Sequence, residues 1–296
     1  MNRFLKFIRI SLGLFVLFLI LYAVKCFVAK PAPDHPYFKP NGFLVIAHRG
    51  GRSLGPESTL YTFRRAVELG VDVLEIDLHS TKDGELVILH DATLERTTNA
   101  TGTARNYTLA ELKKFDAAYH WSPQNSRVYP LRDKQIKIPT LAEVFETFSE
   151  TRLNIEIKES QPDVLPALCQ LIRDYHMSKK VMVASFDADV LKEFRSLCPE
   201  VATSAGASEA TFFYALQKMH LEAAYSPEVN ALQVPVAYGD LEVVNKRFLE
   251  AAHKRNLRVH VWTVNNRDSM KRLLKLGVDG IMTDYPDRLI ELLKNQ

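Results

Sequence analysis

The chain has 296 residues, of which 47% are hydrophobic and 25% are charged, and this is the composition of an ordinary globular protein. Its formal net charge is only +3 and the body contains no dense block of Lys or Arg, so nucleic acid is not an expected partner. A body of about 250 residues is large enough to bury a core without disulfides.

The first predicted element is an apolar helix at the N-terminus. Residues 10–24 carry no charge and form a core shorter than the ~20 residues of a comfortable membrane span. Lys25 could reach the interface by snorkelling, which makes a span from about Phe7 to Val28 workable. A cleaved signal peptide fits less well, because Phe27-Val28-Ala29 is a poor small-residue cleavage site. We therefore expect residues 1–30 to be a transmembrane anchor.

Charges on the two flanks predict the orientation of this helix. Three basic residues precede it and two follow it, which favours a cytosolic N-terminus and a catalytic body outside the cytoplasm. The Pro-rich residues 31–42 are expected to be a short, stiff linker.

From residue 43 to residue 296, short apolar runs rich in β-branched residues alternate with helical patterns. The expected strands are Phe43–Ala47, Val73–Asp77, Leu153–Ile157, Val181–Ser185, Val201–Ser204, Ala231–Val234, Arg258–Thr263 and Gly280–Thr283. The expected helices are Thr59–Leu69, Leu141–Phe148, Val164–Tyr175, Ala188–Leu197, Glu209–Leu221, Leu241–Asn256, Arg267–Leu276 and one that starts at Asp287. This alternation predicts an α/β fold, a (β/α)8 TIM barrel, although a doubly wound open sheet would give the same pattern.

Two features interrupt the alternation. Leu86–Leu89 is a further strand-like run, and the Asp83-Gly84 turn signal that precedes it leaves too little chain for a parallel crossover. We therefore expect this run to return antiparallel to the second strand and to carry His90 to its end. Residues 92–139, with one short helical pattern at Thr108–Phe115, form an insertion after strand 2 that is long enough to be a lid or cap.

The cysteines give a weaker signal. Cys169 and Cys198 lie in predicted helices among apolar residues, so we expect them to be buried thiols. A disulfide between them would fit as well, but sequence spacing cannot establish it.

Polar residues collect where functional groups of a barrel belong, at the carboxyl ends of the strands. The first strand is followed by His48-Arg49-Gly50, and the second and third end in Glu75-Ile76-Asp77 and Glu156-Ile157-Lys158. Trp262 closes the seventh strand, and the hairpin delivers His90-Asp91. Strand alternation puts Glu75 and Asp77 on one face, and likewise Glu156 and Lys158.

These residue types predict a metal-assisted reaction on a phosphate. Three converging carboxylates repel one another unless a hard divalent cation, Ca²⁺, Mg²⁺ or Mn²⁺, lies between them. Arg49 and Lys158 could contact an anionic substrate, and His48 and His90 could act as base and acid near neutral pH. Each residue alone has a simpler explanation, such as a helix cap or a core histidine, but their joint placement at strand ends of one barrel argues against it.

The order and spacing of these motifs resemble the signature of the glycerophosphodiester phosphodiesterase family. The matching segments are His48-Arg49-Gly50, Pro56-Glu57-Ser58-Thr59, Leu74–Asp77, Leu89-His90-Asp91, Thr93–Thr98, Asn154–Lys158 and Gly277–Pro286. The resemblance covers Val45 to the C-terminus, with one departure at Ser58, where the family usually has Asn.

The resemblance implies the same barrel with an insertion after strand 2, one divalent metal ion and a hydrolytic reaction. It implies metal ligands at Glu75, Asp77 and Glu156, catalytic histidines at His48 and His90, phosphate contacts from Arg49 and Lys158, and a supporting Glu57 beside the metal site. From their positions after the hairpin and at the end of the seventh strand, Asp91 and Trp262 are further candidates for supporting roles. The expected reaction converts a glycerophosphodiester to glycerol 3-phosphate and an alcohol.

Three alternatives remain open at this stage. The anchor suggests a lysophospholipase D that acts on lysophospholipids at the membrane, with an apolar lid lined by Phe115, Tyr119, Trp121 and Tyr129, although aromatic residues there could simply pack the insertion. A different class is a barrel that binds phosphate without chemistry. Another lipase of the phosphatidylinositol or sphingomyelinase D type agrees less well with the closing segment Thr283–Pro286.

Overall fold

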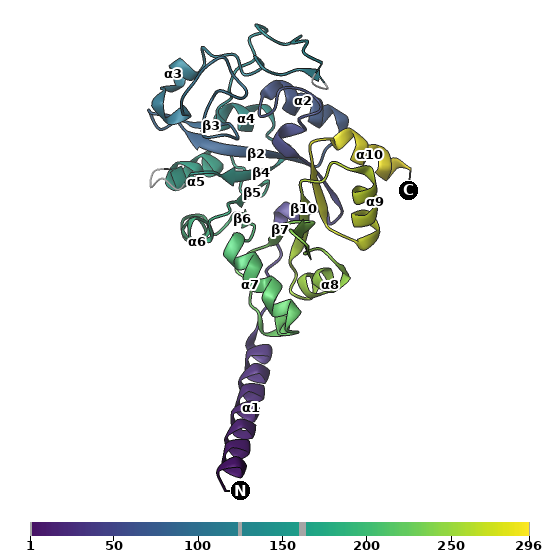
Figure 1. Ribbon diagram of the computed structural model, residues 1–296. Coiled ribbons are helices and arrows are strands. Elements are labelled where there is room, and N and C mark those ends of the chain that lie inside the picture. Colours follow the sequence, from purple (N-terminus) through teal and green to yellow (C-terminus); the bar gives the residue numbers. More distant parts are fainter. Residues whose placement is uncertain (1, 124–125, 160–163, 296) are drawn as a thin grey trace.

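The computed structural model describes residues 2–123, 126–159 and 164–295 (Figure 1). Parallel strands form its centre, in the order β6-β5-β4-β2-β1-β11-β10-β7. A parallel bridge between Ser204 and Ala231 joins the two outer strands, so the sheet is a nearly closed barrel, as predicted. The barrel strands are β1 (Leu44–Ala47), β2 (Val73–Ser80), β4 (Arg152–Ile157), β5 (Val181–Ala184), β6 (Ala202–Thr203), β7 (Ala231–Pro235), β10 (Arg258–Trp262) and β11 (Gly280–Thr283).

Helices surround this barrel and pack their apolar faces on the strands (Figure 1). They are α2 (Leu60–Leu69), α4 (Leu141–Thr147), α5 (Val164–Asp174), α6 (Ala188–Leu197), α7 (Ala207–Lys218), α8 (Lys246–Lys254), α9 (Arg267–Leu276) and α10 (Pro286–Lys294). Local sequence sets their ends: α2, for example, begins where the Thr59 hydroxyl accepts a hydrogen bond from the Thr62 N–H and ends at Gly70 in the left-handed conformation.

One predicted helix starts later than expected. The pattern from Leu241 suggested a helix, but Leu241–Glu242 forms a short strand, β9, paired with β8 (Ala237–Tyr238). Gly239, with φ of +57°, makes the turn between them. The helix begins only after Asn245, whose side chain accepts a hydrogen bond from the Phe248 N–H at 3.0 Å.

The hairpin after β2 is confirmed. β3 (Leu86–Ile88) pairs antiparallel with β2, and Gly84 supplies the left-handed turn with φ of +83°. The ladder continues to the Leu89 N–H, which donates to the Asp77 carbonyl at 3.0 Å. His90 therefore lies next to the part of β2 that carries Asp77, as the turn signal predicted.

The insertion has a small core of its own. Leu94, Leu112 and Ile138 are buried there around α3 (Leu109–Leu112) and the 3-10 helix η3 (Ala104–Asn106). Three of the four aromatic residues considered for a lid pack the insertion itself. Phe115 stacks edge-on with Tyr107, and the Arg132 guanidinium lies 4.1 Å from the ring centres of both Tyr119 and Tyr129.

The N-terminal helix α1 (Asn2–Val28) projects from the body on the side away from the insertion (Figure 1). Residues Phe4–Val28 are long and apolar enough to cross a membrane, and none of the most apolar stretch is buried. The Tyr22 hydroxyl donates to the His220 carbonyl at 3.2 Å. Beyond the helix, Tyr37 and Phe38 of the 3-10 helix η1 (Pro36–Phe38) are buried with residues of β1, β2 and β7 and fill the amino-terminal end of the barrel.

The expectation of two buried thiols was wrong. Cys169 and Cys198 form a disulfide between α5 and the end of α6, with their Cα atoms 5.9 Å apart. The two helices are neighbours around the barrel, and that proximity is invisible in a sequence separation of 29 residues. Cys26 is a free cysteine.

Candidate active site

The strand ends bring the predicted acidic residues together. Glu75 and Asp77 alternate on β2 and are each 1% exposed, while Glu156 lies on the neighbouring strand β4 in register with Asp77. One carboxylate oxygen from each of the three lies within 4.8 Å of the others. The carboxyl end of the barrel thus carries an acidic triad, Glu75, Asp77 and Glu156.

The electrostatics of this triad favour a bound cation. Burial, followed by the charges of Asp77 and Glu156, raises the pKa of Glu75 well above its usual range. Burial likewise raises the pKa of Glu156. Both oxygens of Asp77 are buried, and their charged neighbours are Lys158 at Oδ1 and Arg49 at Oδ2. Buried carboxylate oxygens from three residues this close together are the ligand set of a hard divalent ion.

Two basic side chains lie against the triad. The Lys158 ammonium is 2.9 Å from Asp77 Oδ1 and 2.8 Å from Glu156 Oε1. Burial alone would lower the pKa of Lys158, but these two carboxylates raise it, so the side chain stays charged. The Arg49 N–H donates to Glu75 Oε2 at 2.7 Å, and Arg49 Nε lies 3.8 Å from Asp77 Oδ2. Arg49 is in the left-handed conformation, with φ of +52°, directly after β1.

His90 is held by a chain of charges that leads to Arg49. His90 Nδ1 lies 2.7 Å from Asp91 Oδ1, and Arg96 binds both Asp91 and Glu57. Glu57 also accepts a hydrogen bond from Arg49 Nη1 at 3.0 Å. Although burial alone would raise the pKa of Glu57, the hydrogen bond from Arg96 and the charges of its Arg neighbours lower it to about 2. Arg96 was not singled out from the sequence, although it lies in the family-like segment after His90.

The second histidine has its own carboxylate. His48 Nδ1 lies 2.7 Å from Asp284 Oδ1, and Asn265 Nδ2 donates to Asp284 Oδ2 at 2.8 Å. Burial would raise the pKa of Asp284, but the hydrogen bond from His48 lowers it. Sequence reasoning gave neither Asp284 nor Asn265 a role in the site. Their signal was present, because Asp284 stands in the closing motif directly after β11.

Burial lowers the pKa of His90, even though the hydrogen bond to Asp91 opposes this shift. The neutral ring is therefore favoured. With Nδ1 of both His48 and His90 engaged by a carboxylate, the Nε2 atoms are the ones left to exchange protons with a substrate.

Trp262 lies apart from this charged network. Its ring meets that of Phe186 edge-on, with centroids 5.7 Å apart, and Phe186 is 59% exposed. The two rings form an apolar rim at the ends of β5 and β10.

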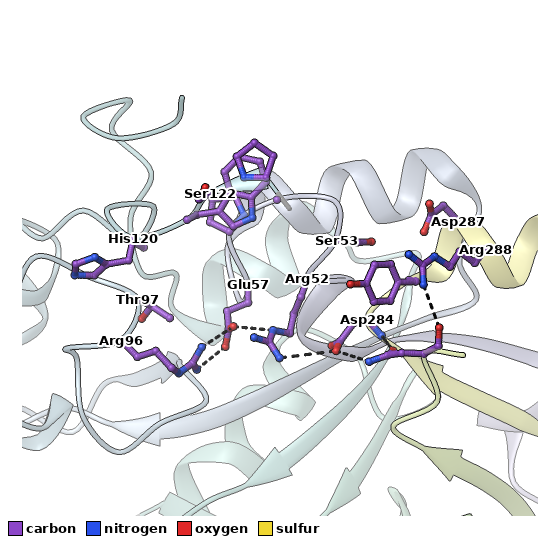
Figure 2. Close-up of a pocket in the computed structure, with 17 residues that line it drawn as sticks. Arg52, Ser53, Glu57, Arg96, Thr97, His120, Ser122, Asp284, Asp287 and Arg288 are labelled. Carbon is purple, nitrogen blue, oxygen red and sulfur yellow. Dashed lines mark hydrogen bonds and ion pairs between the residues drawn. The ribbon is translucent and has the colours of Figure 1, made fainter. Parts of the chain in front are cut away.

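A cavity of about 800 Å³ opens next to the charged network. In Figure 2, Glu57 lies between the guanidinium groups of Arg96 and Arg52, and Arg52 also reaches towards Asp284. The insertion contributes His120, Trp121 and Ser122 to the wall, and α10 with the residue before it contributes Tyr285, Asp287 and Arg288. A substrate group lying here would touch the insertion on one side and the barrel on the other.

The chain is similar to known phosphodiesterases in sequence and in fold. The model of the glycerophosphoryl diester phosphodiesterase family matches residues 48–288. A glycerophosphodiester phosphodiesterase of Caldanaerobacter subterraneus subsp. tengcongensis is 34% identical over 259 residues, which is 85% of this chain and 98% of that protein. A lysophospholipase D of Mus musculus is 26% identical over 275 residues, covering 84% and 86% of the two chains. Among solved structures, an Oleispira antarctica phosphodiesterase in complex with the product sn-glycerol-3-phosphate superposes with a TM-score of 0.72 at 26% identity, covering 88% of this chain and 100% of that one.

Proposed function

The chain belongs to the glycerophosphoryl diester phosphodiesterase family and is a phosphodiesterase that acts on glycerophosphodiesters, and from this premise we propose how its residues carry out the hydrolysis. The products are glycerol 3-phosphate and an alcohol. The observation that carries the proposal is the pair of carboxylate-held histidines, His48 with Asp284 and His90 with Asp91, at the same barrel end as the acidic triad.

The acidic triad would hold one divalent ion, Ca²⁺, Mg²⁺ or Mn²⁺. Its all-oxygen ligand set fits a hard cation better than Zn²⁺. Such an ion would stabilise negative charge on the phosphoryl oxygens. Arg49 and Lys158, which lie beside the triad, would bind the same phosphate through charge-assisted hydrogen bonds.

The two histidines would share the proton transfers. One takes a proton from the nucleophile through Nε2, and the other gives a proton to the leaving alkoxide. In each ring the carboxylate at Nδ1 fixes the tautomer and stabilises the charged form that appears during the reaction. Glu57 and Arg96 would keep Arg49 and Asp91 at a constant separation, because Glu57 binds both arginines.

A substrate panel with defined metals tests this proposal. The purified full-length protein is stripped with a chelator and assayed on glycerophosphocholine, glycerophosphoethanolamine and glycerophosphoinositol, with each divalent ion added back separately. We expect loss of turnover after stripping and recovery with at least one of Ca²⁺, Mg²⁺ or Mn²⁺. Full turnover in the chelated protein would refute the metal assignment.

A second candidate substrate is a lysophospholipid. The lysophospholipase D relative and the apolar helix α1 favour it. Against it, the chain from α1 enters the barrel at the amino ends of the strands, where Asn256 Nδ2 donates to the Ala32 carbonyl, whereas the acidic triad lies at the carboxyl ends. The wall of the cavity is also rich in charged groups. We therefore expect faster turnover of glycerophosphocholine than of lysophosphatidylcholine.

We also propose that residues 1–30 anchor the enzyme in a membrane, followed by a connecting segment 31–42 and a catalytic domain 43–296 with the insertion at about 92–139. The catalytic domain would lie outside the cytoplasm. The Cys169–Cys198 disulfide supports this side, because disulfides persist mainly in oxidising compartments. A cysteine-labelling reagent that cannot cross the membrane, applied to intact cells that carry an added Cys on the domain surface, tests the orientation.

A further inference from the structure

One buried side chain next to the active site has no part in the mechanism above. His79 lies on β2, two residues after Asp77, and is only 2% exposed. Its ring is in hydrogen-bond range of a partner through each nitrogen. Nδ1 lies 2.7 Å from Glu159 Oε1, and Nε2 lies 3.3 Å from the His90 carbonyl oxygen.

These contacts join three separate segments of the site. Asp77 and His79 belong to β2, His90 follows the antiparallel strand β3, and Glu159 follows Lys158 after the end of β4. The insertion is connected as well, because Arg105 Nε lies 3.5 Å from Glu159 Oε2. The ring of His79 is therefore a cross-link between the strand that carries two triad carboxylates and the loops on both sides of it.

The contact with His90 occurs where the β-ladder ends. The last ladder bond of the hairpin joins the Leu89 N–H to the Asp77 carbonyl, and the pairing of β2 with β3 covers only Leu86–Ile88. Asp91 holds the ring of His90 at Nδ1, but that contact does not fix the main chain from which the ring extends. The hydrogen bond from His79 holds the main chain at this position.

We propose that His79 is a positioning residue for catalysis, which holds the main chain of His90 in place beside β2 and couples it to Lys158 through Glu159. The inference rests on the proposed role of His90. A buried imidazole costs desolvation that an apolar residue at this position would avoid, and its polar contacts with Glu159 and the His90 carbonyl are contacts that an apolar residue could not make. Within the described residues, the His79 side chain is hydrogen-bonded or ion-paired neither to Arg49 or Lys158 nor to the carboxylates of the triad.

The expected effect is on turnover and not on binding. A displacement of a catalytic group by ~1 Å can cost about 10²-fold in rate. His79→Phe keeps a planar ring but removes both polar contacts. We therefore expect kcat to fall about 10- to 100-fold, while KM and the metal concentration for half-maximal activity change less than about twofold. His79→Gln can place an amide N–H near the position of Nε2 and should restore part of the loss.

A double-mutant cycle with His90→Ala tests the inference on the full-length protein in detergent, with glycerophosphocholine and saturating divalent ion. If His79 acts through His90, His79→Phe lowers kcat in the wild-type background but causes no further loss in the His90→Ala background. An equal loss in both backgrounds, or wild-type kcat for His79→Phe, would overturn it. Thermal midpoints of all variants control for misfolding, and His79→Gln provides a reading if His79→Phe is unstable.

The two proposals fail in different ways. Near-normal turnover of His90→Ala would refute the acid/base role of His90 and with it the role of His79. A strong loss in His90→Ala together with additive effects would leave the mechanism intact and refute only the positioning role.

Discussion

Replacement of Asp284 by Asn should reverse the hydrogen bond that orients His48. Asp284 accepts from two sides, with His48 Nδ1 at Oδ1 and Asn265 Nδ2 at Oδ2. The orientation of Asn265 is fixed, because its Oδ1 accepts from the Asp284 N–H at 2.9 Å and from the Thr283 hydroxyl at 3.1 Å. Asn265 can therefore only donate to the side chain of residue 284. In Asp284→Asn the amide oxygen would turn to Asn265 and the amide NH₂ to His48.

This reversal sets the size of the expected effect. An NH₂ group facing His48 Nδ1 requires that nitrogen to accept, so the proton moves to Nε2 and the ring can no longer take a proton from a nucleophile. We expect kcat to fall by ~10²–10⁴-fold, the usual contribution of one acid/base group, which corresponds to about 3–5 kcal/mol in the barrier. KM should change little, because Arg49 and Lys158 lie outside the altered hydrogen bonds.

The assay is steady-state release of glycerol 3-phosphate from glycerophosphocholine, with kcat and KM fitted separately. Asp279→Asn is the matched control, because Asp279 makes the same type of contact with His253 at 2.8 Å but lies before β11, at the opposite end of the barrel. A kcat for Asp284→Asn within threefold of wild type would refute the reasoning. Equal losses in Asp284→Asn and Asp279→Asn would show a general effect on folding and not on His48.

Three further predictions concern stability. Glu75→Gln should raise the thermal midpoint of the metal-free protein more at pH 8 than at pH 5. Burial raises the pKa of Glu75, so the charged carboxylate destabilises the folded state increasingly as pH rises above the pKa of this group in the unfolded chain. The same variant should abolish the increase in midpoint that a divalent ion causes in wild type. His253→Gln should lower the midpoint more at pH 5.5 than at pH 9, because the hydrogen bond to Asp279 raises the pKa of His253 and its stabilisation is lost as pH rises through that value. Cys198→Ser should lower the free energy of unfolding, measured by urea titration, by ~3–4 kcal/mol, because the disulfide restricts the unfolded chain across a separation of 29 residues. Cys26→Ser should not lower it, since Cys26 is a free cysteine.

The barrel itself was predictable from the sequence for a simple physical reason. Parallel strands are buried on both faces, so they appear as short apolar runs, and all residues of β1, β2, β5 and β11 are buried. The antiparallel return of β3 was predictable because the Asp83-Gly84 turn leaves no room for a crossover. Register along β2 then placed Glu75 and Asp77 on one face.

The contacts that complete the site were not predictable from local patterns. His48 and Asp284 are 236 residues apart and meet because β1 pairs with β11, with Ala47 opposite Thr283. Which strand is the neighbour of β1 depends on closure of the barrel, and no local periodicity encodes it. The salt bridges of Arg96 with Glu57 depend in the same way on how the insertion folds back over the barrel.

The packing of η1 determines where the barrel can be separated from helix α1. Tyr37 is fully buried and Phe38 is 8% exposed beneath the strands, and the Ala32 N–H donates to the Arg255 carbonyl at 2.8 Å. These residues are part of the hydrophobic core even though they precede the first strand. A protease that cleaves between Val28 and Pro31 would therefore release an intact enzyme, whereas cleavage after Phe38 would expose Leu44 and Ile46 and open the base of the barrel to water.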